Sequence, residues 1–205
     1  MRFTMTLALT INSGIVVGSV VFAFVALVTL IVLYNGLAVR RVRMSNAFSQ
    51  IDVQLRRRSD LIPNLVQVVK GYAQHERATL EAVIRARGDV NAAAVEASAG
   101  NFGAMRALSA ASMALGGALQ GLFARIEAYP DLKASVQFLS LQEQLVTTEN
   151  RVAFARQAFN DAVMRYNEGV VTFPGNLVAG VFQFEQAELW TTPEDSRAVP
   201  SARMF

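Results

Sequence analysis

The stretch from Gly14 to Leu33 has twenty residues and no charged side chain, and it lies within an uncharged run bounded by Arg2 and Arg40. At about 1.5 Å rise per residue, twenty helical residues match the roughly 30 Å hydrocarbon layer of a bilayer. A helix satisfies its own backbone polar groups where water is absent. The sequence therefore predicts a short segment at 1–13 and then one membrane-spanning helix at 14–34.

A cleaved signal peptide is the alternative interpretation of this stretch. Signal peptides have an apolar core of about 7–15 residues, followed by small residues at a cleavage site. The apolar run here is longer, and the only comparable site is Gly36-Leu37-Ala38, beyond which periodic helical sequence continues. An uncleaved anchor is therefore favoured.

Basic residues on the two sides of the anchor predict its orientation. Arg2 precedes it, whereas Arg40, Arg41 and Arg43 follow it. The positive-inside rule then places the bulk of the chain in the cytoplasm and the N-terminus outside. The three arginines that follow are also candidate contacts for anionic lipid headgroups, at roughly 1 kcal/mol each.

The composition favours helices and disfavours metal chemistry. Of 205 residues, 53% are hydrophobic, and only 5 are Pro and 13 are Gly. Long stretches without Pro or Gly are typical of helices rather than of a sheet protein dense in turns. Zero Cys and a single His argue against disulfides, thiolate sites and a zinc or iron centre. We therefore expect no metal and no cofactor.

Apolar residues after the anchor recur at steps of three and four residues, which is typical of one buried helix face. One series predicts a helix that ends near Arg58, and the next predicts a helix from Asp60 to about Ala94. Asp60 would be the N-cap of this second helix, with Pro63 in its first turn. A single kinked helix is the alternative.

Two further helices are predicted, from about Leu108 to Tyr129 and from about Phe138 to Gly169. Long helices joined by short connections favour an antiparallel bundle. The predicted fold is therefore all-α: one N-terminal transmembrane helix followed by an up-and-down four-helix bundle at 35–169.

The third predicted helix follows a small polar loop at 95–101 and has a second possible interpretation. Residues 107–124 are uncharged and contain Gly117 and Gly121 at GxxxG spacing, so they could form a second membrane span. Ala, Gly, Ser and Gln fill two thirds of this stretch and gain little from hydrocarbon. A helix buried in the bundle is favoured.

The C-terminal part contains a hydrophobic segment at 170–187 and a polar tail at 188–205. On an up-and-down topology the hydrophobic segment returns to the membrane-proximal end. There it packs across the base of the bundle, which we favour, or lies in the lipid interface as an amphipathic piece. The tail is predicted to be mobile.

Three blocks of sequence resemble the LemA family of bacterial membrane proteins. The run NAFSQIDVQLRRRSDLIPNLVQVVKGYAQHE at 46–76 resembles the family signature, and YPDLKA at 129–134 resembles a second block. The third block is matched by short pieces, namely Phe138-Leu139, Leu141-Gln142, TEN at 148–150 and YN at 166–167. Departures are mild, such as Phe48 where the family often has Trp.

This resemblance implies a single N-terminal membrane helix, a four-helix bundle and no established catalytic activity. It also implies the inner membrane of a bacterium, or an intracellular membrane derived from it. Some members are associated with compartments such as magnetosomes, which suggests a membrane-organising role.

A charged docking surface is the candidate functional site. Up-and-down topology would bring the turn at 57–64 beside the turn at 129–133, at the end of the bundle far from the membrane. The candidate residues are Arg57, Arg58, Asp60, Asn64, Asp131 and Lys133. The structural alternative is that Asp60 caps a helix while an arginine pairs with a carboxylate across the bundle.

Other motifs point away from chemistry. His75-Glu76 lacks the second His of an HExxH motif, since Thr79 occupies its place. The arginines at 56–58 have no interleaved aromatic residues, so nucleic acid is not an expected partner. We find no nucleophile, base or metal-ligand set, and we expect no catalytic residues.

These features predict a non-enzymatic, membrane-anchored scaffold at the cytoplasmic face, which organises or remodels membrane or assembles partner proteins. The expected partners are membrane lipid and other membrane proteins. Gly14 and Gly18 in the span could allow self-association, or they could simply face lipid. The alternative is an adaptor or regulatory subunit of a membrane enzyme, which docks through 57–64 and 129–133.

Overall fold

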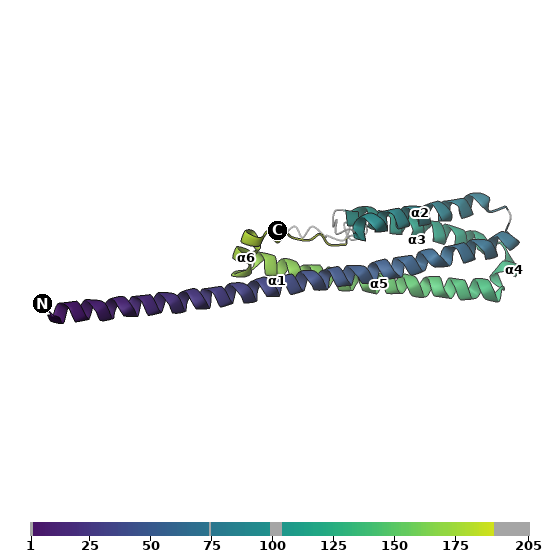
Figure 1. Cartoon of the computed structure of the whole chain (residues 1–205). Coiled ribbons are helices and arrows are strands. Elements are labelled where there is room, and N and C mark those ends of the chain that lie inside the picture. Colours follow the sequence, from purple (N-terminus) through teal and green to yellow (C-terminus); the bar gives the residue numbers. More distant parts are fainter. Residues whose placement is uncertain (1, 74, 99–103, 191–205) are drawn as a thin grey trace, which may run out of the picture. The chain divides into compact units, whose positions relative to one another are not determined.

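A computed structural model describes residues 2–73, 75–98 and 104–190, and those parts contain helices but no strand (Figure 1). The helices are α1 (Arg2–Tyr72), α2 (Arg77–Ser98), α3 (Met105–Ile126), α4 (Pro130–Lys133), α5 (Val136–Val171) and α6 (Gly175–Phe182). The predicted all-α class with a long apolar N-terminal helix is confirmed. The chain divides into two compact units, unit 1 (1–42 and 165–186) and unit 2 (43–164 and 187–205).

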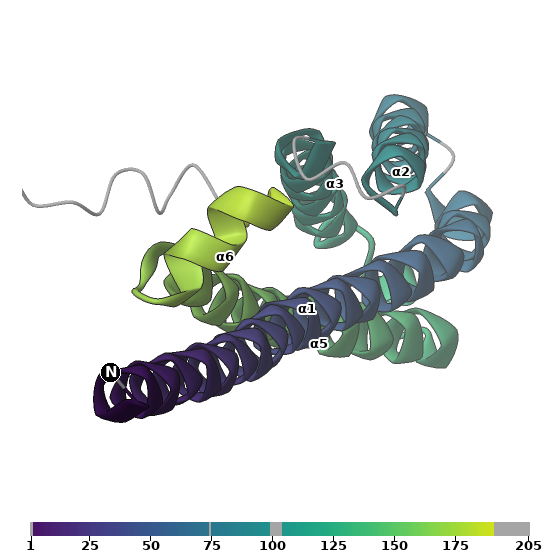
Figure 2. The same cartoon turned by 60° about the vertical axis from the view of Figure 1, so that its left-hand side comes forward.

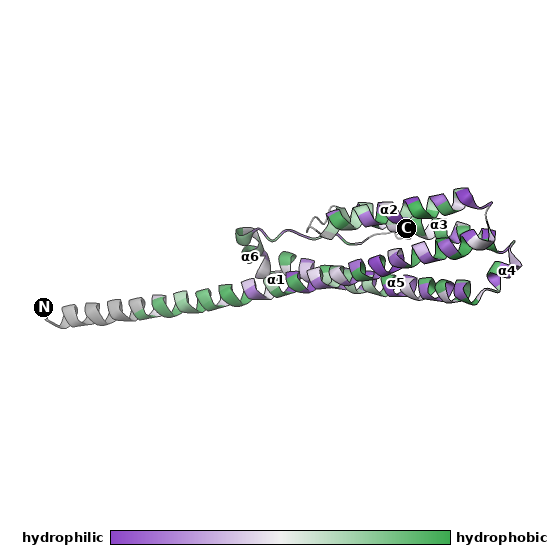
Figure 3. Ribbon diagram, turned by 45° about the vertical axis from the view of Figure 1, so that its right-hand side comes forward, coloured by the Kyte–Doolittle hydropathy of each residue, from purple (hydrophilic) through white to green (hydrophobic). Residues whose placement is uncertain are grey.

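The apolar part of α1 has the length and composition of a membrane span. Its most apolar window has a mean hydropathy of 2.6 and none of that window is buried within the protein. Exposed side chains here include Phe22 and Phe24, and the hydropathy colouring shows a continuous hydrophobic stretch (Figure 3). Such a surface is stable in lipid and unfavourable in water, because apolar area gains free energy when water is removed from it.

The predicted break between Arg58 and Asp60 is wrong, because α1 continues through this point to Tyr72. Pro63 lies inside the helix and has no N–H, so the carbonyl of Ser59 loses its donor within the helix. Arg87 of α2 supplies the missing donor, with its Nε 2.8 Å from that carbonyl oxygen. Asp60 is therefore an exposed residue within a helix, and not an N-cap.

Unit 2 contains one core that is shared by four helical segments. Its part of α1 lies beside its part of α5, and α2 lies beside α3 (Figures 1 and 2). Phe48 of α1 packs edge-on against Phe159 of α5 at 5.9 Å between ring centroids, and Phe123 of α3 packs against Phe138 of α5 at 6.2 Å. The fully buried side chains include Ile51, Leu55, Ile62, Leu65, Leu108, Leu115, Leu122 and Phe159. These residues belong to the stripes that the three- and four-residue spacing predicts.

Helix α3 is the second helix that is long and apolar enough to cross a membrane, with a mean hydropathy of 1.4. Its apolar stripe is buried in unit 2, at Leu108, Leu115, Leu119, Leu122 and Ile126. A stripe that faces neighbouring helices is the arrangement predicted for a bundle helix. Helix α2 ends at Ser98, so the predicted loop at 95–101 is wrong for its first residues, and residues 99–101 lie outside the described part of the chain.

Unit 1 joins α6 to the end of α5 and to the first part of α1. The ring of Tyr34 in α1 contacts Phe182 at 4.9 Å and Phe184 at 5.6 Å between centroids. Gly169 of α5 has no side chain to obstruct Arg40, whose Nη1 lies 2.6 Å from the position of a Cβ there. A Cβ on Gly175 would overlap the Gly169 carbonyl oxygen. Gly169 therefore allows α5 to approach α1 closely, and Gly175 allows α6 to turn back closely onto α5.

Trp190 differs from the prediction of a mobile tail that begins at residue 188. Its side chain is buried in unit 2. Its backbone N–H donates to Asn160 Oδ1 at 2.8 Å, and Asn160 Nδ2 donates to the Trp190 carbonyl at 3.0 Å. The tail from residue 191 onward lies outside the described residues.

The close approach at Gly175 leads to a prediction about α6. Gly175→Ala is expected to weaken the local packing by about 1–3 kcal/mol, because the added methyl group overlaps backbone rather than a side chain that can move. Amide hydrogen exchange of the full chain in detergent should then be faster at 175–184. Gly180→Ala is the control, since a Cβ there meets nothing within 4 Å. Equal exchange in the two variants would contradict the prediction.

The bond between Arg87 and Ser59 leads to a second prediction. Arg87→Met leaves the Ser59 carbonyl without its donor and is expected to cost about 1–3 kcal/mol of unfolding free energy. In a Pro63→Ala background the helix regains its own N–H donor, so the same change should cost less, with a coupling of about 0.5–3 kcal/mol.

Unfolding can be followed by denaturant titration of the full chain in detergent, with fluorescence of the single Trp as the signal. Arg85→Met is the matched control, because Arg85 lies exposed on the same helix. Additive effects in the double variant would show that Arg87 does not compensate for Pro63.

Candidate functional site

The two neighbouring arginines of the predicted docking surface have different environments, one in solvent and one in the core. Arg57 is exposed, whereas the Arg58 side chain is only 5% exposed and pairs with Glu149 of α5 at 2.7 Å. Burial lowers the pKa of Arg58, the carboxylate of Glu149 raises it, and the like charge of Arg156 lowers it. This pair corresponds to the structural alternative derived from the sequence, in which an arginine pairs with a carboxylate across the bundle.

A small polar residue stands next to each partner of this ion pair in the sequence. Ser59 and Thr148 are buried, and the side chain of Thr148 donates to the carbonyl of Gln144 in its own helix. A Cβ on Gly116 of α3 would lie 3.6 Å from Arg58 Nη2, so the glycine leaves room for the guanidinium. The pairing of Arg58 with Glu149 favours one register of the helices, because a shifted register would leave the buried guanidinium without its counter-charge.

The other predicted docking residues lie in two places. Asp60 and Asn64 are exposed on α1, whereas Asp131 and Lys133 are exposed on the short helix α4. Lys133 pairs with Glu127, which immediately follows α3. Arg57 precedes the end of α1 by fifteen residues, or roughly 22 Å of helix, so the segment 57–64 is not the turn at the end of unit 2.

The segment that does lie beside the α3–α5 connection follows α1, and its described residues are Ala73, His75 and Glu76. The hydroxyl of Tyr129 donates to Glu76 Oε1 at 3.2 Å, and Thr79 donates to Glu76 Oε2 at 3.3 Å. Burial, followed by the charge of Glu76, raises the pKa of Tyr129. The segment after α1 therefore meets the segment after α3. Glu76 makes the contact with residues 129–133 that the sequence predicted for the segment containing Asp60. Sequence reasoning singles out His75-Glu76 only as a surface pair and misses this contact.

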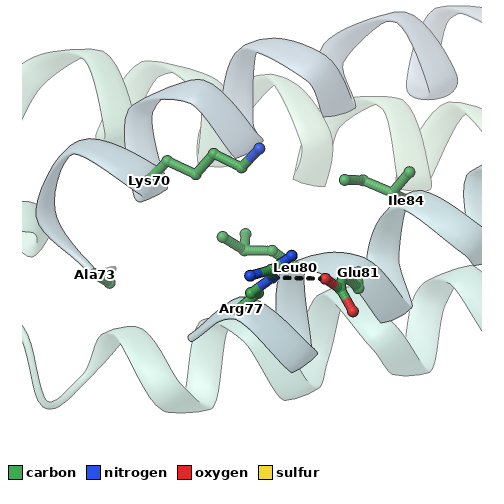
Figure 4. Close-up of a pocket in the computed structure, with 6 residues that line it drawn as sticks. All are labelled: Lys70, Ala73, Arg77, Leu80, Glu81 and Ile84. Carbon is green, nitrogen blue, oxygen red and sulfur yellow. Dashed lines mark hydrogen bonds and ion pairs between the residues drawn. The ribbon is translucent and has the colours of Figure 1, made fainter. Parts of the chain in front are cut away.

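A pocket of about 410 Å³ lies between the end of α1 and the start of α2 (Figure 4). It is lined by Lys70, Ala73, Arg77, Leu80, Glu81 and Ile84. Arg77 and Glu81 pair at 3.0 Å across one helical turn, so their charges compensate each other. The lining therefore combines apolar side chains with three charged ones.

The arginines that follow the anchor are all exposed. Arg40 donates to the carbonyl of Arg165 in α5 at 3.0 Å and thereby holds the end of that helix in unit 1. Burial raises the pKa of Tyr166 and the nearby charge of Arg41 lowers it. Contact of Arg40, Arg41 and Arg43 with lipid headgroups stays a prediction. Within the described residues, no group of three His, Asp or Glu side chains could hold a metal ion.

The unequal exposure of the buried ion pair leads to a third prediction. Glu149→Gln leaves the Arg58 charge buried without a counter-charge, and we expect a loss of about 1–3 kcal/mol of unfolding free energy. Arg58→Leu should cost less, because it removes the buried charge while Glu149, 52% exposed, can turn to water.

Denaturant titration of the full chain, followed by fluorescence of the single Trp, measures both variants. Glu143→Gln serves as the control, since Glu143 is an exposed residue of the same helix. A larger loss in Arg58→Leu than in Glu149→Gln would mean that the pair is held mainly by packing of the arginine.

Known proteins resemble this chain over most of its length. It is 28% identical to the magnetosome proteins MamQ 1 and MamQ 2 of Paramagnetospirillum magneticum, over 82% of this chain and 67% of each relative. It is 27% identical to the magnetosome protein MamQ of Magnetospirillum gryphiswaldense, over 82% of this chain and 68% of the relative. The LemA family matches residues 47–203. This match covers well over half of the sequence, and the chain therefore belongs to the LemA family.

Proposed function

We propose that this protein is a non-enzymatic, membrane-anchored helical scaffold at the cytoplasmic face of a bacterial membrane. It organises or remodels the membrane, or it assembles partner proteins there. Its relatives carry the name magnetosome protein, which supports an intracellular membrane compartment such as a magnetosome as the place of action. The arginines at 40, 41 and 43 support the cytoplasmic placement of the bulk of the chain.

The observation that carries this proposal is an exposed apolar stripe along α5. Val136, Leu139, Val146 and Phe154 are 80, 48, 53 and 72% exposed. At 100° per residue these four side chains fall within an arc of about 80°. The core residues of the same helix, such as Phe138 and Phe159, point to the other side. Exposed apolar side chains along one face of a helix are typical of a surface that another helix covers.

Polar residues interrupt the stripe at a regular interval. Glu143, Asn150 and Gln157 are exposed on the same face and are spaced by seven residues. Polar side chains within an apolar helical seam select the partner and its register at some cost in affinity. This pattern supports association of α5 with the α5 of a second copy, and hence assembly of the scaffold in the plane of the membrane.

Reconstitution of the full chain into liposomes tests the scaffold. The unmodified chain is expected to form multimers, detected by crosslinking, and to deform the liposomes, detected by cryo-electron microscopy. Phe154→Glu should reduce both, because it places a charge in the seam. Val95→Glu is the matched control, since Val95 of α2 is 68% exposed and lies outside the stripe.

A chain that stays monomeric at every protein density on undeformed liposomes would overturn the scaffold. The adaptor alternative then predicts one discrete partner after crosslinking in cells. We propose that the exposed residues of the predicted docking surface would make its contacts, namely Arg57, Asp60, Asn64, Asp131 and Lys133.

A further inference from the structure

We propose that α6 binds the lipid interface and buries one face among the headgroups of an anionic leaflet, beside the end of the membrane-spanning part of α1. This inference rests on membrane anchorage, which is one part of the proposed function, and is independent of self-assembly. It concerns unit 1 alone.

The outward face of α6 is apolar and exposed. Phe173, just before the helix, and then Leu177 and Val181 follow one another at four-residue spacing and are 78, 62 and 74% exposed. The opposite face packs inward through Val178 and Ala179, which are buried. Both faces of this short helix are therefore apolar, and only one of them is covered within the chain. Water is a poor solvent for the other face.

Contacts with Tyr34 fix the level of α6 relative to the span. Tyr34 stands at the end of the predicted membrane segment 14–34, and its ring meets Phe182 and Phe184 at 4.9 and 5.6 Å. Tyrosine side chains gather where hydrocarbon meets headgroups, because the ring is apolar and the hydroxyl remains hydrated. The aromatic cluster therefore holds α6 at the boundary of the bilayer.

Positive charge stands next to this cluster in the same unit. Arg40 and Arg41 follow Tyr34 by two helical turns and are exposed, and Arg40 also holds the carbonyl of Arg165. Guanidinium groups at this level attract anionic headgroups. Eight helical residues reach only about 12 Å, which is too short to cross the hydrocarbon layer. An apolar face beside cations and without spanning length is typical of a helix that lies in the interface.

Quenching of single fluorophores in the full chain tests this inference. The protein has no Cys, so Val181→Cys and Val95→Cys can each carry one environment-sensitive label. Both valines are similarly exposed, at 74 and 68%. In vesicles of phosphatidylcholine and phosphatidylglycerol at low protein density, the label at 181 should be quenched by a lipid that carries a nitroxide on its acyl chain. The label at 95 should be quenched by aqueous iodide instead.

Two further measurements distinguish a face that lies in lipid from one that protein covers. Leu177→Glu in the Val181→Cys chain should transfer quenching from the nitroxide lipid to iodide, because it charges the same face. Vesicles of phosphatidylcholine alone should weaken the lipid quenching, because the arginines lose their anionic partners.

Iodide quenching at 181 equal to that at 95 would overturn the inference, since the face would then lie in water. Protection of the label from both quenchers would overturn it as well, because protein would cover the face. The Phe154→Glu chain, whose self-association is expected to be lost, should give the same quenching at 181. Failure of the scaffold and failure of the interfacial helix are thus distinguishable.

Discussion

The bond from Arg87 to the carbonyl of Ser59 is the interaction on which the length of α1 depends. Proline within a helix removes one backbone donor and disfavours continuation. Here a side chain from α2 satisfies the freed carbonyl, and α1 therefore runs from Arg2 to Tyr72. The same helix therefore contains both the predicted membrane segment and one of the four helical segments that share the core of unit 2.

Much of this arrangement is predictable from local sequence, since length and periodicity are local properties. The uncharged run predicts the membrane helix, and the three- and four-residue steps predict which side chains, such as Leu55 and Leu115, are buried. The errors have long-range causes. From local sequence, Pro63 indicates a helix break, and only the distant contact of Arg87 with the Ser59 carbonyl explains why the helix continues. Likewise, Trp190 lies in a polar tail by sequence, and only its hydrogen bond with Asn160 places it in the core. The turn expected at 57–64 is wrong for the same reason, because α1 continues through the predicted break.

Apolar surface is distributed differently in the two units, and this distribution suggests different partners. In unit 1 the exposed aliphatic and aromatic side chains belong to the span and to α6, next to arginines. In unit 2 an exposed stripe lies on α5 among Glu, Asn and Gln residues that suit a protein seam. A lipid interface favours apolar side chains beside charges that complement the headgroups, whereas a helical partner requires apolar side chains at a regular spacing along the helix.

The pairing of Phe48 with Phe159 has a consequence for biosynthesis. The first ring belongs to the helix that leaves the ribosome first, and the second follows only after most of the chain has been made. At about 5–20 residues per second, the interval is on the order of ten seconds. During that time the span can already be inserted while the apolar stripe of α1 that follows it has no α5 to pack against. A nascent chain of this design therefore exposes that stripe until the ribosome has completed α5.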